Sequence, residues 1–226
     1  MNYYFTEYKK KASNVLHELA SSYPSGSLDE QGVPAYLEGN FLSRWIFHNR
    51  IYMASKYLFQ RSGDKCMDFG CGSGVLLPFL SSLFDVIYAI DIKPEFAQHF
   101  CHLWSQPSPV TFSNIKYFNS LESTITPDNY FDQIVALDSL EHVKNLNAVL
   151  ERMHQLLKQN GHLLFSGPTE NLFYRLGRKI VGFSGRYHHC SIYDVKKEVT
   201  KHFHINYVRK LPFLLPLFLL IDAEKR

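Results

Sequence analysis

The sequence predicts an α/β fold with a doubly wound, mostly parallel sheet of seven strands and an N-terminal helical extension. Two observations predict it. Short apolar runs alternate with helical patterns from about residue 65 onward, and a glycine-rich turn follows the first of these runs. Strands separated by helices of this length require right-handed crossovers and lie parallel in one sheet. The 226 residues suit one domain with a modest extension.

Seven segments have the apolar character of buried strands. The first five are connected through helices and are expected to be parallel, whereas the last two form a hairpin that completes the sheet. In chain order they are Lys65–Phe69, Asp85–Asp91, Ile115–Phe118, Phe131–Asp138, His162–Ser166, Ile205–Leu211 and Leu217–Asp222.

Helical spacing of apolar residues marks the connections. One helix is expected from Val75 to Leu83, a second opens at Pro94, and a third runs from Leu146 to Leu157 and ends at Asn160-Gly161. An earlier helix begins at Leu42, with apolar residues expected on a single face. They are Leu42, Trp45, Ile46, Met53 and Tyr57.

Composition excludes several classes of protein. The 24 Lys and Arg against 21 Asp and Glu give a net charge of only +3, scattered along the chain, which does not favour a nucleic-acid partner. The longest apolar stretch, residues 211–221, is interrupted by two prolines and is shorter than the roughly 20 residues that a membrane span needs. The start has no signal-peptide pattern. The four cysteines (Cys66, Cys71, Cys101 and Cys190) lack metal-type spacing, which indicates reduced thiols in a cytoplasmic protein.

The central motif is Met67-Asp68-Phe69-Gly70-Cys71-Gly72-Ser73-Gly74, between an expected strand and an expected helix. Its glycines permit a tight turn and close approach of a ligand to the backbone. Val75 stands where a dinucleotide fingerprint needs its third glycine, and no P-loop lysine follows Gly74.

This D-x-G-x-G-x-G run resembles motif I of the class I methyltransferases that use S-adenosylmethionine (SAM). The resemblance implies that the turn wraps the methionine part of SAM and that Asp68 assists at its amino group. Asp91, 19 positions after Gly72, ends the second strand, where a carboxylate accepts both ribose hydroxyls. The alternative is that Asp91 caps the helix opened by Pro94.

A second element resembles the type 11 methyltransferases. Residues 126–132 (TPDNYFD) are similar to their P-D-x-x-F-D element, a turn before the fourth strand. An acidic residue that meets adenine in that family aligns with Ser120 here, which is a departure. The resemblance covers about residues 63–166. It implies SAM-binding residues in the glycine turn and at the strand ends: Asp68, Gly70, Cys71, Gly72, Gly74, Asp91, Ile92, Asn119, Ser120, Leu121, Leu137 and Asp138.

The run from Asp138 through Glu141 to His142 is similar to the E-x-x-E-H run of the ubiquinone-biosynthesis O-methyltransferases. In that subgroup these residues can hold a divalent ion that helps ionise a hydroxyl, a chemistry that two carboxylates and an imidazole suit. Similar runs occur in metal-free type 11 enzymes, and we favour a site without metal.

Methyl transfer needs a nucleophile about 3 Å from the methyl carbon and, for a hydroxyl, a base. Histidine is the natural base near neutral pH. His188 and His189 are the first candidates and His142 the second, although histidines in loops usually lie on the surface or in packing contacts. Residues 172–186 form a basic amphipathic stretch. It could contact an anionic acceptor or a membrane surface, but a solvated basic face is the favoured interpretation.

The resemblance implies a helical lid in residues 1–60 and a SAM-binding methyltransferase domain in residues 61–226, with a lid insertion at about 167–193. We expect transfer of a methyl group to a small-molecule or lipid-like acceptor, with oxygen favoured over nitrogen or carbon. The alternative is a SAM-binding regulatory protein without catalysis. The third dinucleotide glycine and an N-P-P-[FY] motif are absent, which disfavours an oxidoreductase and an RNA methyltransferase. The sequence leaves the oligomeric state open.

Overall fold

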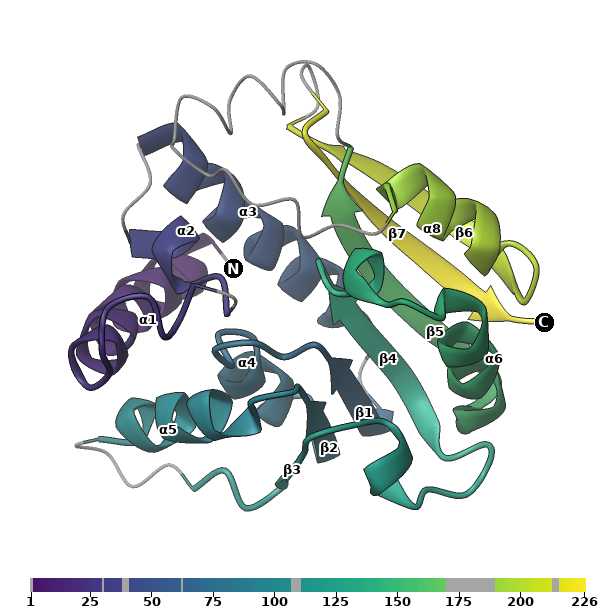
Figure 1. The fold of residues 1–226 in the computed structure, drawn as a ribbon, viewed down its shortest axis with the longest axis horizontal. Helices are drawn as coiled ribbons and strands as arrows, with labels where there is room; N and C mark the ends of the chain where they lie inside the picture. Colours follow the sequence, from purple (N-terminus) through teal and green to yellow (C-terminus); the bar gives the residue numbers. More distant parts are fainter. Residues whose placement is uncertain are drawn as a thin grey trace. The chain divides into compact units, whose positions relative to one another are not determined.

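The computed structural model describes residues 2–29, 31–37, 41–61, 63–106, 111–169, 190–212 and 216–226, and only the backbone of residues 2–4 and 41–43. Its seven strands form a sheet in the order β3-β2-β1-β4-β5-β7-β6 (Figure 1). Their bounds are β1 (Gly63–Phe69), β2 (Phe84–Ile90), β3 (Ile115–Phe118), β4 (Phe131–Leu137), β5 (Leu157–Pro168), β6 (Phe203–Leu211) and β7 (Phe218–Lys225).

Strand directions confirm the predicted mostly parallel α/β sheet. The pairs β2–β3, β1–β4 and β4–β5 are parallel, whereas β7 runs antiparallel to β5 and to β6. The chain divides into two compact units, each with its own set of contacts. The first unit comprises Met1–Ser62 and Cys71–Ser123, and the second comprises Gly63–Gly70 and Thr124–Arg226.

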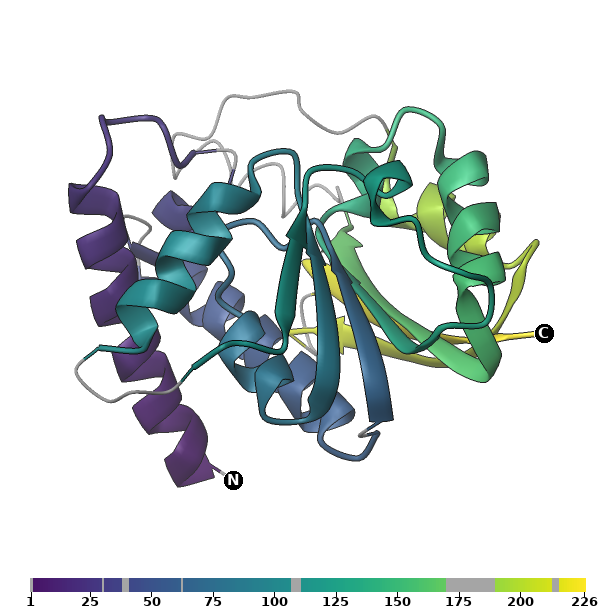
Figure 2. The same cartoon turned by 90° about the horizontal axis from the view of Figure 1, so that it is seen from below.

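The first unit joins the N-terminal helices to the helices that follow β1 and β2. It contains α1 (Asn2–Ser21), α2 (Val33–Leu37), α3 (Phe41–Leu58), α4 (Leu77–Ser81) and α5 (Pro94–Trp104). Helices α1 and α5 lie side by side (Figures 1 and 2). The Tyr8 ring packs 4.8 Å from that of Trp104, and the Tyr23 hydroxyl lies 3.0 Å from Nδ1 of His99. Aromatic contacts therefore attach the predicted N-terminal extension to α5.

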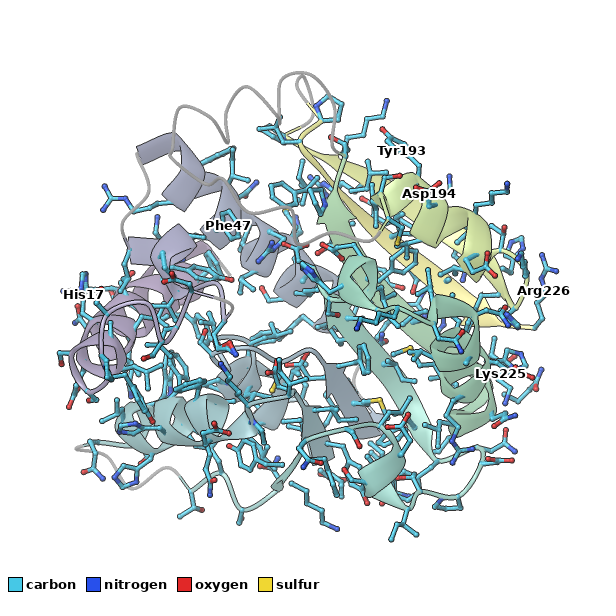
Figure 3. All side chains as sticks on the ribbon, in the orientation of Figure 1. His17, Phe47, Tyr193, Asp194, Lys225 and Arg226 are labelled. Atoms are coloured by element: carbon cyan, nitrogen blue, oxygen red, sulfur yellow. The ribbon has the colours of Figure 1, made fainter. Side chains whose placement is uncertain are left out.

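The second unit places two helices on one face of β5 (Figure 1). Helix α6 (Leu146–Leu156) begins at Asn145, whose side chain accepts a hydrogen bond from Ala148 N. Helix α8 (Ile192–Val199) begins with a capping box between Ser191 and Asp194. Tyr193 and Asp194 lie on the exposed side of that helix start (Figure 3). The short helices η1 (Glu122–Thr124) and η2 (Leu140–His142) follow β3 and β4.

Two element boundaries differ from the sequence-based prediction. Helix α4 begins at Leu77 rather than Val75, because Val75 and Leu76 complete the turn and Pro78 favours the first turn of a helix. Asn160-Gly161 does not end α6. Leu157 already pairs with Phe131, and Asn160 adopts a φ of 61° inside β5, where the register with β4 shifts. The predicted helix stop is therefore an irregularity within a longer strand.

Among the described side chains of α3, which do not include Leu42, the predicted apolar face is wrong at Trp45. Ile46 and Met53 are buried, whereas the Trp45 side chain is 39% exposed. Trp45 adjoins Ile46 in sequence, and neighbouring residues on a helix point about 100° apart. The buried face follows Ile46, Met53 and Ala54.

In the part of the chain that the structure describes, no helix combines the length and apolar character that crossing a membrane requires. The largest fully buried side chains are phenylalanines at positions 100, 131, 165 and 203. Cys66 and Cys101 are buried as well, and none of the four cysteines, all of which the structure describes, is in a disulfide.

A buried histidine gives the first unit a predicted pH dependence. His48 of α3 packs against Tyr36 of α2 with ring centroids 5.3 Å apart. Burial, together with the charges of Lys9 and Arg44, lowers the pKa of His48 from 6.5 to about 4. The unfolded chain therefore binds one more proton than the folded chain between about pH 6.5 and pH 4, so stability falls as the pH drops through this window.

His48→Gln should reduce the loss of unfolding free energy between pH 7 and pH 4.5, by at most about 3 kcal/mol. Urea unfolding at the two pH values measures it. The same change at His17, which is exposed on α1 (Figure 3), is the matched control and should leave the pH dependence of the wild type. An unaltered pH dependence in His48→Gln would contradict the assignment.

Candidate functional site

The glycine turn that follows β1 is fixed by backbone hydrogen bonds. Cys71 N donates to Ile90 O at 3.0 Å, and Gly74 N donates to Cys71 O at 2.9 Å. Gly74 lies directly on α5, where a Cβ atom would come within 2.9 Å of the Ala97 Cα atom. The turn thus lies at the end of β2, and its glycines allow α5 to pack directly on its backbone.

The Asp91 carboxylate follows β2 and binds this turn. Gly72 N donates to Asp91 Oδ2 at 2.9 Å, and Lys93 N donates to Asp91 Oδ1 at 3.1 Å. Helix α5 begins after Lys93 without any side-chain capping bond. Asp91 is therefore not the helix cap that was the alternative interpretation. Each carboxylate oxygen has two lone pairs, so both keep the capacity to accept a further donor.

The residues after β2 and β3 differ in exposure. Ile92 beside Asp91 is 74% exposed, an unusual position for a large apolar side chain. Asp91 N donates to Phe118 O at 3.1 Å, which brings the start of the loop after β3 to the end of β2. Asn119 is exposed in this loop and Leu121 is buried.

The Ser120 hydroxyl is used inside its own loop. It accepts a hydrogen bond from Ser123 N at 3.2 Å, and the Ser123 hydroxyl donates to Ser120 O at 2.7 Å. Ser120 stands where the resembling family has an acidic residue. Its side chain has a local role here, because it closes the turn that leads into η1.

Gln31 is a residue of this region that the sequence did not reveal. It belongs to the connection between α1 and α2, and its carbonyl oxygen would lie 3.3 Å from a Cβ atom on Gly72. Its side chain is 6% exposed. A glutamine in a turn-prone stretch has no spacing or neighbour that marks it, so sequence alone offered no signal.

In the second unit, the end of β1 packs against the segment after β4. Gly70 has a φ of 73°, and a Cβ atom there would lie 2.3 Å from the Ser139 Cβ atom. The Ser139 hydroxyl donates to Phe69 O at 2.8 Å. Asp68 is buried one residue before the end of β1, in register with Val135. Glycine is therefore required at position 70, both because its φ is positive and because a side chain would overlap Ser139.

Asp138 is held at the end of β4 by β5. Its backbone has a φ of 52°, its N–H donates to Ser166 O at 3.0 Å, and its Oδ1 atom accepts from the Ser166 hydroxyl at 2.6 Å. Ser166 is fully buried and pairs with Leu137. An aspartate with positive φ is uncommon and occurs often in functional sites, and two bonds to a buried serine fix its orientation.

The three residues of the weighed metal site are not brought together as ligands. Glu141 is buried, and a Cβ atom on Gly167 would lie 3.5 Å from its Oε1 atom, whereas His142 is exposed. Over the residues described, the structure contains no group of three or more His, Cys, Asp or Glu side chains arranged to hold a metal ion.

Two other groups, one in each unit, stay protonated at neutral pH. Burial raises the pKa of Tyr117 far above its usual value, and the Cys101 thiol to which it is hydrogen-bonded raises it further. Burial also raises the pKa of Cys190, with Asp194 and Glu141 adding to the effect. Neither group can act as a base or an anionic nucleophile at neutral pH. His188, His189, most of the insertion at 167–193 and the stretch 172–186 lie outside the described residues.

Comparison with known proteins places the chain in a family. A family model described as a methyltransferase domain matches residues 41–201, which is more than half of the chain. The chain belongs to the methyltransferase domain family. This confirms the family that the glycine turn and strand order indicated.

The mitochondrial ubiquinone biosynthesis O-methyltransferase of Schizosaccharomyces pombe is 31% identical over 119 residues, 51% of this chain and 42% of that protein. Its counterpart in Rattus norvegicus is 35% identical over 122 residues, 51% of this chain and 34% of that protein. The matched regions thus span less than half the length of these two relatives.

Solved structures share the fold. N-methyltransferase NodS from Bradyrhizobium japonicum WM9, in complex with S-adenosyl-L-homocysteine, gives a TM-score of 0.63 at 16% identity, covering 95% of this chain and 98% of NodS. Magnesium protoporphyrin IX methyltransferase from Synechocystis PCC 6803 gives 0.67 at 18% identity, covering 89% and 95%.

Gly70→Ala should lower the free energy of unfolding more than Gly32→Ala does. Gly32 has nearly the same φ, 72°, but a Cβ atom there meets nothing within 4 Å. Left-handed backbone costs about 1–2 kcal/mol in both variants. The overlap with Ser139 adds roughly 1–3 kcal/mol in Gly70→Ala alone. Chemical denaturation measures both, and equal losses would show that Gly70 is required only for its conformation.

Proposed function

We propose that this chain transfers the methyl group of SAM to an oxygen of a small-molecule or lipid-like acceptor. The observation that carries the proposal is the Asp91 carboxylate, bound to the backbone of the glycine turn at the end of β2. Membership of the methyltransferase domain family supports the reaction class.

The residues of the first unit fit the parts of SAM. Asp91 can accept the two ribose hydroxyls through the lone pairs that its backbone bonds leave over. Ile92, exposed next to it, offers an apolar contact for the adenine ring. Gly72 and Gly74 let the turn pack closely on the Gln31 carbonyl and on α5, which holds it beside Asp91 for the amino-acid part. SAM supplies an electrophilic methyl group on a sulfonium, and these residues bind and orient it.

The remaining cofactor residues are proposed on position. Cys71 belongs to the turn, and Asn119, Ser120 and Leu121 follow β3. Asp68, Gly70, Leu137 and Asp138 lie at the ends of β1 and β4, and the carboxyl ends of parallel strands are where open α/β sheets bind ligands.

The acceptor oxygen is proposed from the relatives, whose names give O-methylation in ubiquinone biosynthesis. A hydroxyl acceptor must lose a proton, and His188, His189 and His142 are the bases that we propose. His142 is exposed after β4 and therefore accessible. We further propose residues 1–60 as a lid, supported by the approach of Gln31 to Gly72, and a cytoplasmic location, supported by four cysteines none of which is in a disulfide.

Asp91→Ala should weaken binding of SAM at least tenfold, because charge-assisted hydrogen bonds to the ribose are lost. Asp91→Asn, which keeps acceptor capacity without the charge, should lose less. Isothermal titration calorimetry measures the affinities. Asp85→Ala, at an exposed position of β2, is the control and should bind as the wild type does. Wild-type affinity in Asp91→Ala would remove the basis of the proposal.

Incubation with SAM and a small catechol should yield S-adenosylhomocysteine and the methylated catechol in equal amounts. The initial rate should be unchanged by a metal chelator, because Asp138, Glu141 and His142 do not gather as ligands. Mass spectrometry counts both products. Binding of SAM without turnover of any acceptor in a cell extract would favour the regulatory alternative. Loss of activity with a chelator would show that the reaction needs a metal ion.

A further inference from the structure

Gln31 has a buried polar atom that its surroundings do not satisfy. Its side chain is 6% exposed, and its Oε1 atom is shielded from solvent without a hydrogen-bond partner among the residues described. Buried amide oxygens are nearly always paired, since leaving one unpaired is costly. A buried acceptor of this kind is expected where a ligand brings the missing donor.

The backbone holds Gln31 beside the glycine turn. Gln31 N donates to Leu28 O at 3.2 Å, and the next turn closes with Ala35 N donating to Gly32 O at 3.1 Å. The Gln31 carbonyl lies so close to Gly72 that a Cβ atom on Gly72 would be 3.3 Å from it. Gly72 is the residue whose N–H binds Asp91. Gln31 and the proposed ribose-binding carboxylate are therefore on either side of one residue.

We propose that Gln31 Oε1 accepts a hydrogen bond from the α-ammonium group of SAM, which makes Gln31 a specificity residue for the amino-acid part of the cofactor. The inference rests on the proposed function. SAM has three kinds of N–H or O–H donor: the ribose hydroxyls, the adenine amine and the ammonium. Asp91 takes the hydroxyls and Ile92 marks the adenine side, so the ammonium is the donor that remains, and its three N–H groups allow an acceptor besides Asp68. It is also the strongest match, because a cationic donor gives a charge-assisted bond.

The test compares three ligands on the full chain with Gln31→Met, which keeps the side-chain length and removes the amide. S-adenosylhomocysteine carries the ammonium and a carboxylate, decarboxylated SAM carries an ammonium only, and 5′-methylthioadenosine carries neither. Loss of a hydrogen bond to a charged group is worth roughly 10- to 100-fold in affinity. We expect that loss for the first two ligands and unchanged affinity for 5′-methylthioadenosine. Gln60→Met, at an exposed glutamine of the same unit, is the matched control and should lose nothing.

Stability without ligand gives an independent readout. Because Oε1 has no partner to lose, Gln31→Met should unfold at the wild-type temperature or above it. A fall in unfolding temperature, or failure to fold, would show that the amide is a structural bond and would overturn the proposal. Gln31→Glu keeps an acceptor oxygen and should retain S-adenosylhomocysteine better than Gln31→Met.

Comparison of the three ligands distinguishes failure of the Gln31 proposal from failure of the proposed function. Equal losses for all three ligands would mean that Gln31 only supports packing, and a loss confined to S-adenosylhomocysteine would move the contact to the carboxylate. Unchanged affinity throughout would remove Gln31 from the site, while the proposed function stands. If the wild-type chain binds none of the three ligands, the proposed function itself fails.

Discussion

The hydrogen bond from Gly72 to the Asp91 carboxylate connects the two features on which a SAM site depends, the bare backbone of the turn and the acid at the end of β2. A carboxylate in that place has to be oriented before a ligand arrives, because a freely rotating side chain would lose that freedom on binding. The bonds from Gly72 and Lys93 orient both oxygens with backbone donors and leave lone pairs for a ligand. The site is thus prepared by the fold itself.

Within the first unit, the N-terminal helices pack close to the glycine turn. Helix α1 packs along α5, and the Tyr8 hydroxyl donates to the carbonyl of Val75, directly after the turn. The connection from α1 to α2 then brings Gln31 against Gly72. The N-terminal extension therefore contacts the turn through the Gln31 backbone and the residue after the turn through the Tyr8 hydroxyl, which supports our proposal of a lid. This is the physical basis for treating it as part of the site.

Spacing in the sequence was sufficient for the features that depend on local backbone. The glycines, the strand that ends before Asp91 and the helix opened by Pro94 all follow from turn chemistry and periodicity, and the sheet and the family are confirmed. Features that depend on tertiary packing were not accessible. The exposure of Trp45, the irregularity at Asn160 and the burial of Gln31 are set by partners distant in sequence, which periodicity does not encode.

In the second unit, the fold likewise orients a carboxylate, that of Asp138 at the end of β4. Asp138 pays a conformational cost for its positive φ, and the buried Ser166 offsets it with one bond to the backbone and one to the carboxylate. A purely structural residue in that place would be replaced by glycine or asparagine without loss of fold. A carboxylate at this position, oriented by a buried hydroxyl, is expected where its negative charge binds a ligand. The two bonds from Ser166 thus support our proposal of Asp138 as a cofactor-binding residue, independently of whether a metal ion is involved.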